Sequence, residues 1–193
     1  MKNINIMIDL ETLSTHPTAA IISLGAVMFT EDRIVGKELY DVDVQEVIDK
    51  GFHVDVETLK WWMNQDKVTQ KANLNGSWGI EDALDAFMRD ILMYGSDSIL
   101  IWSNGASFDI PILKNAINVT VNYDSDVSFE ILWRYNQEMC YRTISKLYPD
   151  VEWEGVNNHI ALSDAINQAN HLIKIGQKYK VVGDLLKFGI DYE

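Results

Sequence analysis

Hydrophobic residues open the chain in a short run, residues 4–8, that ends at two acidic residues, Asp9 and Glu11. A continuous apolar run of this length is typical of a buried strand. Two further segments rich in β-forming residues follow at 20–29 and 34–42, joined by a short polar connection. This pattern predicts three antiparallel strands at the start of the chain.

The pattern changes to helical spacing after the third strand. Asp55 precedes a set of apolar residues at helical spacing, and the strongest helical stripe runs over residues 80–92. A short apolar strand at 98–102 and a glycine-containing loop then lead to a helix that begins near Ile110, with Pro111 in its first turn. Strands that alternate with helices pair in parallel, so we expect the later strands to run parallel to the first.

The last third of the chain is less regular. We predict a strand at 131–135, a short helix at 143–148 that stops before Pro149, a helix at 160–175 followed by Gly176, and a weaker helix at 181–188. The sequence as a whole therefore predicts one α/β domain over residues 1–193. Its core is a mixed five-stranded sheet, with the first three strands antiparallel, the later strands parallel to the first, and helices on both faces.

Composition narrows the class of protein. The chain has 193 residues, of which 47% are hydrophobic, and this is enough for one sizeable core. Its one cysteine excludes an internal disulfide, and no segment reads as an export signal or a membrane span, so a cytoplasmic location is expected. The net charge of −13 argues against a protein that coats nucleic acid non-specifically, but it allows a small site that receives one phosphodiester at a metal.

The acidic pair at the end of the first strand suggests a site that binds a cation. Alternate residues of a strand point to the same side, so Asp9 and Glu11 face the same way at a separation of about 7 Å. Their like charges repel each other, which costs free energy. A divalent cation bound between them would remove this repulsion, and hard divalent cations prefer carboxylate oxygens as ligands.

Three other residues are candidates to join this pair, and each has a structural alternative. Asp109 is an ordinary helix N-cap by its place before Pro111, but it also lies at the carboxyl end of a central strand, where open α/β sheets bind ligands. Asp164 is suited to stabilise the helix dipole, or to face a cleft beside small alanines. A histidine such as His159 is more often a surface or packing residue than a catalyst.

The order of these residues resembles that of the DEDDh exonucleases of the ribonuclease H-like superfamily. The first motif matches residues 9–12, the second matches residues 104–109, and the third, His-x-x-x-x-Asp, matches residues 159–164. The fuller strings are most similar to the small stand-alone 3′–5′ exoribonucleases of bacteria and phages. Residues 118–150 match that pattern only loosely.

The resemblance implies a catalytic centre made of Asp9, Glu11, Asp109, Asp164 and His159. The four carboxylates would hold two divalent ions, Mg²⁺ or Mn²⁺, about 4 Å apart, and His159 would be the general base. In relatives, residues that adjoin the ligands hold the terminal nucleotide by backbone contact and stacking; here these are Thr12, Leu13 and Phe108.

The implied activity is release of nucleoside 5′-monophosphates from the 3′ end of single-stranded nucleic acid. RNA is favoured because the closer family branch acts on RNA, and trimming of DNA is the alternative. From another class, an inactive module that binds 3′ ends or acts as a scaffold could keep the same fold. Close relatives are often homodimers, so a homodimer is expected, and no membrane partner is.

Overall fold

The computed structural model describes residues 4–94, 99–120, 132–156 and 159–180. Within them, five strands form one sheet in the order β3-β2-β1-β4-β5. The long strands β1 (Ile4–Thr12), β2 (Ile21–Phe29) and β3 (Ile34–Asp41) are antiparallel to one another, whereas β4 (Ile99–Ser103) is parallel to β1 and β5 (Glu138–Cys140) is parallel to β4. The mixed sheet predicted from the sequence is confirmed.

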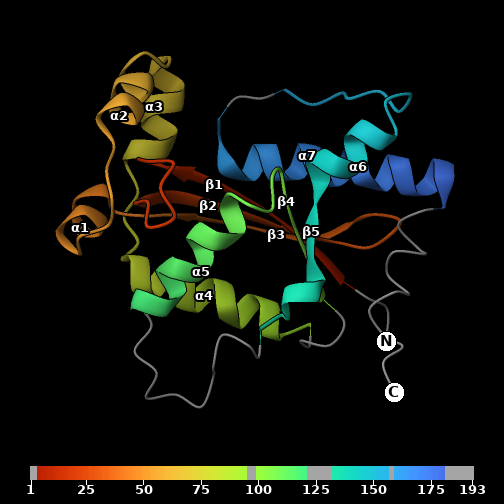
Figure 1. Ribbon diagram of the computed structural model, residues 1–193, viewed down its shortest axis with the longest axis horizontal. Coiled ribbons are helices and arrows are strands. Elements are labelled where there is room, and N and C mark those ends of the chain that lie inside the picture. Colours follow the sequence, from red (N-terminus) through yellow and green to blue (C-terminus); the bar gives the residue numbers. More distant parts are fainter. Residues whose placement is uncertain (1–3, 95–98, 121–131, 157–158, 181–193) are drawn as a thin grey trace.

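Helices cover both faces of this sheet (Figure 1). Helix α4 (Ile80–Leu92) and helix α5 (Asp109–Thr120) lie on one face, and α6 (Tyr141–Leu147) and α7 (Ala161–Tyr179) lie on the other. Three short helices lie beyond the end of the sheet where β1 ends: α1 (Val44–Asp49), α2 (Val56–Met63) and α3 (Lys67–Leu74).

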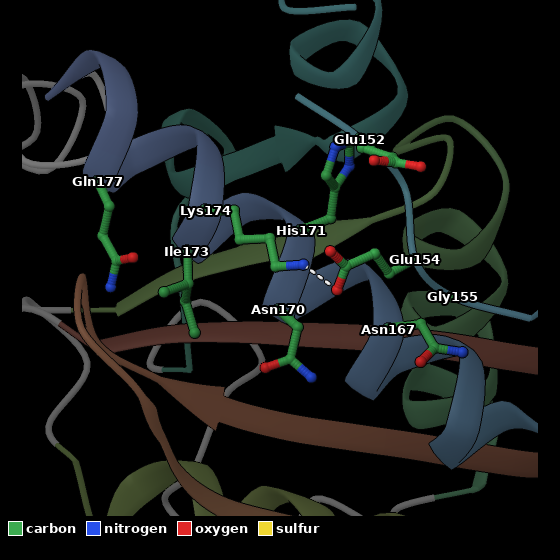
Figure 2. A pocket seen from close by; sticks show the side chains of 9 residues that line it. All are labelled: Glu152, Glu154, Gly155, Asn167, Asn170, His171, Ile173, Lys174 and Gln177. Carbon is green, nitrogen blue, oxygen red and sulfur yellow. Dashed lines mark ion pairs between the residues drawn. The ribbon is translucent and has the colours of Figure 1, made fainter. Parts of the chain in front are cut away.

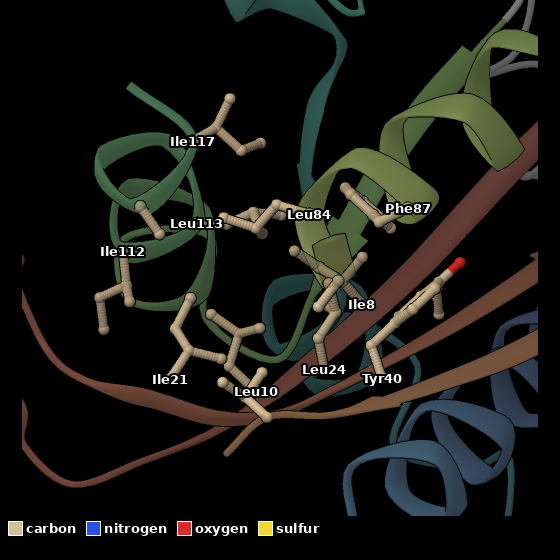
Figure 3. Packing of buried hydrophobic residues seen from close by; sticks show 14 of the residues in the cluster. Ile8, Leu10, Ile21, Leu24, Tyr40, Leu84, Phe87, Ile112, Leu113 and Ile117 are labelled. Carbon is tan, nitrogen blue, oxygen red and sulfur yellow. The ribbon is translucent and has the colours of Figure 1, made fainter. Parts of the chain in front are cut away.

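Side-chain alternation along β1 separates the two cores. Ile6, Ile8 and Leu10 belong to the larger cluster, which is filled by residues of α4 and α5 (Figure 3). Met7 points the other way, into the cluster with Ala165 of α7. Odd-numbered residues of β1 therefore face α7.

Some element predictions need correction. Residues 132–134 form no strand and Tyr135 begins a 3₁₀ turn, so the strand predicted at 131–135 is wrong in its described part. The edge strand is instead Glu138–Cys140. Leu132 and Trp133 are buried core residues in a non-strand segment. Their apolar composition alone does not distinguish such a segment from a buried strand.

One further boundary differs, and two helices were not predicted. Helix α7 continues past Gly176, which lies buried within it, to Tyr179, and Lys180 in a left-handed conformation is its C-cap. Helices α1 and α3 were not predicted, because α1 buries only Val47 and α3 buries only the polar residues Thr69 and Asn73, so neither has an apolar stripe. The helix predicted at 181–188 lies outside the described residues.

Candidate active site

The carboxylates of β1 face helix α7 at the end of the strand. Asp9 and Glu11 share the side of Met7, and Glu11 is only 8% exposed. The pairing of β1 with β2 shifts register between Glu11 and Thr12, a bulge of the kind that often re-aims side chains beside active sites.

Asp109 reaches the same place because β4 is shorter than β1. Parallel pairing of the two strands ends at Ile8 and Ser103, so the Leu10 N–H lies beyond the part of β1 that is paired with β4. The Asp109 carboxylate accepts a hydrogen bond of 3.1 Å from the Leu10 N–H. Asp109 therefore joins the start of α5 to β1, in addition to opening its own helix.

Asp164 is brought in by the close approach of α7 to the sheet. Gly25 is opposite Asp9 in the β1–β2 register, and a β-carbon there would lie 2.4 Å from the carbonyl carbon of Ala161, the first residue of α7. With only hydrogen at this position, the helix start packs directly on the strands. Ligand atoms of Glu11, Asp164 and His159 all lie within 4.8 Å of one another.

His159 is held just before α7 in a left-handed conformation, with φ of 52°. Its carbonyl oxygen accepts a hydrogen bond of 2.6 Å from the buried Asn73 amide of α3. Its ring stands edge-on to Trp61 of α2, with centroids 4.8 Å apart. Helices α2 and α3 thus fix the position of His159, which its neighbours in the sequence do not determine.

Burial raises the pKa values of these carboxylates, and the repulsion between neighbouring carboxylates raises those of Asp9 and Glu11 further. Burial raises the pKa of Glu11 to about 8, and the neighbouring Asp164 and Asp109 raise it too. The pKa of Asp9 is raised well above its ordinary value by burial and then by Asp109, Glu11 and Asp164. Burial also raises the pKa of Asp109 to about 6, although the hydrogen bond from Leu10 opposes this shift.

This donor set fits a divalent cation. Buried carboxylates that repel one another, with an imidazole beside them, are oxygen and nitrogen ligands whose charge a metal ion would neutralise. All five residues singled out from the sequence are brought together: Asp9, Glu11, Asp109, His159 and Asp164.

A pocket of about 420 Å³ adjoins Glu11. Thr12, Trp61 and Phe108 line it, together with residues of β1 and α2. Its volume is in the usual range for small-ligand sites. Leu13 does not line this pocket, and its side chain is fully buried in the core, so a contact of Leu13 with a nucleotide would be made through its backbone.

A second pocket, of about 390 Å³, lies further along α7 (Figure 2). It is lined by amides and charged side chains, and Lys174 forms an ion pair with Glu154 there. The carboxylates of the candidate active site do not line this pocket.

Four residues of the site were not predicted from the sequence: Gly25, Trp61, Asn73 and Gln168. Glycine in a strand is a signal of close backbone approach and could have indicated the first. The other three are ordinary helix residues in sequence, and only tertiary packing gives them their partners.

Comparison with solved structures supports the same fold. The E. coli exonuclease I–single-stranded DNA complex in its zinc-bound form aligns with a TM-score of 0.67 at 12% identity, over 97% of this chain and 43% of that one. Complexes of the E. coli enzyme with a dT13 and a dA16 oligonucleotide align with TM-scores of 0.66 and 0.65, at 11% and 12% identity, each over 97% of this chain and 43% of theirs. The chain thus spans less than half the length of these structures.

The strand order and pairing give this chain the mixed α/β fold of these exonuclease I structures, with the carboxylates at the end of its central strand β1. Within that fold class, the chain belongs to the 3′–5′ exoribonuclease Rv2179c-like domain family, whose model matches residues 4–175. A search of curated proteins returned no match. None of the described helices has the length and apolar character needed to cross a membrane.

Proposed function

We propose that this protein is a metal-dependent 3′–5′ exonuclease that removes nucleoside 5′-monophosphates from single-stranded nucleic acid, with RNA preferred. One observation carries the proposal: four carboxylates and His159 converge beside a pocket large enough for a nucleotide. A module that only bound 3′ ends would have no need for so costly a group of buried acids.

Two divalent ions, Mg²⁺ or Mn²⁺, would supply an activated water and charge stabilisation of the leaving oxygen when bound. Asp9, Glu11, Asp109 and Asp164 would hold them. His159 would act as the general base that takes the proton from the attacking water. Thr12 and Phe108 line the adjoining pocket, and together with the backbone of Leu13 they would hold the terminal nucleotide.

The preference for RNA rests on membership of an exoribonuclease-like family. DNA remains the second candidate substrate, because the structurally similar exonuclease I complexes hold DNA oligonucleotides. A homodimer, a cytoplasmic location and a single domain over residues 1–193 are parts of the same proposal. Light scattering of the purified protein tests the dimer against the chain mass of 22.1 kDa.

The test is degradation of 5′-labelled RNA and DNA 12-mers of one sequence, with Mn²⁺, Mg²⁺ or EDTA. Wild type should give a ladder that shortens from the 3′ end, faster on RNA, and chromatography should identify 5′-monophosphates. Asp9→Asn should abolish it. His159→Asn should slow it by about 10²- to 10⁴-fold, the usual contribution of a general base. Asparagine also tolerates the left-handed backbone at this position.

The outcomes separate the alternatives. Faster loss of DNA would favour the DNA-trimming enzyme. Tight binding of 3′ ends with no ladder under any metal would favour the inactive module, and an active Asp9→Asn protein would overturn the assigned site.

A further inference from the structure

Gln168 lies one turn beyond Asp164 on α7 and reaches the candidate active site from inside the fold. It is 3% exposed. Its Nε2 donates a hydrogen bond of 2.9 Å to Oδ1 of Asp9 on β1, 159 residues earlier in the chain. The buried residues of α7 are alanine, leucine, isoleucine and glycine apart from Asp164, Gln168 and His171, and of these three Gln168 bonds to the Asp9 carboxylate.

The other end of this amide is buried without a hydrogen-bond partner among the described residues. Gln168 Oε1 accepts no hydrogen bond from any residue in the described part of the chain. A buried polar atom left unpaired costs free energy, and a methionine here would fill similar space without that cost. Fold stability alone therefore does not explain an amide at this position.

The crowding around Asp9 supplies a reason. Asp9 interacts unfavourably with Glu11, Asp109 and Asp164, so repulsion alone would turn its carboxylate away from the others. The N–H donor of Gln168 holds one carboxylate oxygen in place. The reverse orientation of the amide would set two oxygens against each other, so the donor is the end that faces Asp9.

We propose that Gln168 is a positioning residue that holds Asp9 in the orientation required for divalent-metal binding, with its buried Oε1 available as an acceptor for water in the site. This inference rests on the proposed function. Hydrogen-bond partners of metal ligands commonly contribute 10- to 100-fold to metal affinity or activity, and Gln168 has the geometry of such a partner.

The test compares Gln168→Met with wild type and with Gln177→Met. Gln177 is an exposed glutamine nine residues further along the same helix, on the wall of the second pocket (Figure 2), so it is a matched control. Mn²⁺ affinity is measured directly, by calorimetry or by the electron paramagnetic resonance signal of free Mn²⁺. Activity is measured across a Mn²⁺ titration, and unfolding is followed in EDTA.

Gln168→Met should bind Mn²⁺ 10- to 100-fold more weakly, and its activity should recover largely at high Mn²⁺. Gln177→Met should match wild type. Gln168→Asn keeps an amide one methylene shorter, so it should show the same weakening, and it is the variant to use if the methionine variant does not fold.

Unchanged Mn²⁺ affinity in a folded Gln168 variant would overturn the positioning role and leave the proposed function intact. A purely structural role would lower only the unfolding temperature and would overturn it equally. Absence of both Mn²⁺ binding and activity in wild type would instead overturn the proposed function, and this inference with it.

Discussion

Gly25 of β2 and Ala161 of α7 are in such close contact that a β-carbon on Gly25 would lie 2.4 Å from the Ala161 carbonyl carbon. Because Gly25 is also the register partner of Asp9, this contact sets the distance between the strand and helix that carry the site. A side chain at position 25 would push the start of α7 outward, and Asp164 with it.

Gly25→Ala should therefore reduce exonuclease activity at least tenfold and destabilise the fold by about 1–3 kcal/mol, the usual cost of overpacking. Gly36→Ala is the control, because that strand glycine would meet first the flexible end of Met28. Chemical denaturation and activity assays measure the two effects. Wild-type activity in a folded Gly25→Ala protein would contradict the argument.

Stability without metal should fall as pH rises. The folded protein keeps Glu11 protonated to about pH 8 and Asp109 to about pH 6, whereas their ordinary pKa values are 4.5 and 3.8. At a pH between the ordinary and the raised pKa of each group, the unfolded chain binds fewer protons than the folded one, so the free energy of unfolding decreases with pH. The stability that comes from these two protonated carboxyl groups is fully present below their ordinary pKa values, and it is lost as the pH rises through their raised pKa values.

Thermal unfolding in EDTA at pH 5 to 8 tests this expectation. Glu11→Gln should flatten the decline between pH 5 and 8 and raise the unfolding temperature at pH 8. Saturating Mn²⁺ should do the same for wild type, because the ion binds the deprotonated carboxylates. An identical decline in wild type and Glu11→Gln would show that Glu11 is not its source.

Asn73→Leu should slow catalysis by about tenfold, because it removes the hydrogen bond to the His159 carbonyl oxygen. Loss of this part-buried hydrogen bond should also cost about 0.5–1.5 kcal/mol of stability. Asn75→Leu removes a comparable amide bond at the end of the same helix without touching His159. Equal kinetic effects of the two variants, measured as kcat, would argue against a specific role for Asn73.

Trp61→Leu should raise KM about tenfold or more with a smaller effect on kcat, if the exposed indole at the pocket packs on a nucleotide base. Trp78→Leu is the matched control, because Trp78 is similarly exposed but does not line that pocket. Steady-state kinetics on short oligomers distinguish the two. A drop in kcat alone would indicate that Trp61 acts only through its contact with the His159 ring.

Local sequence was sufficient for the long elements. The apolar run before Asp9 predicted β1, the stripe of residues 80–92 predicted α4, and Asp55 predicted the start of α2, where its carboxylate accepts the Thr58 N–H. These patterns are legible because burial on one side of a strand or helix imposes its period on the sequence. The order of the motifs along the chain also singled out the four carboxylates and His159, because that order carries the family resemblance.

Tertiary structure alone decided how these residues meet. That Asp109 bonds to Leu10 follows from β4 ending earlier than β1, and that Asp164 reaches Glu11 follows from the missing side chain at Gly25. Neither relation has a local period, since each joins segments far apart in the chain. The sequence by itself determined which chemical groups this protein has and on which elements they lie; packing between distant elements determined that they form one site.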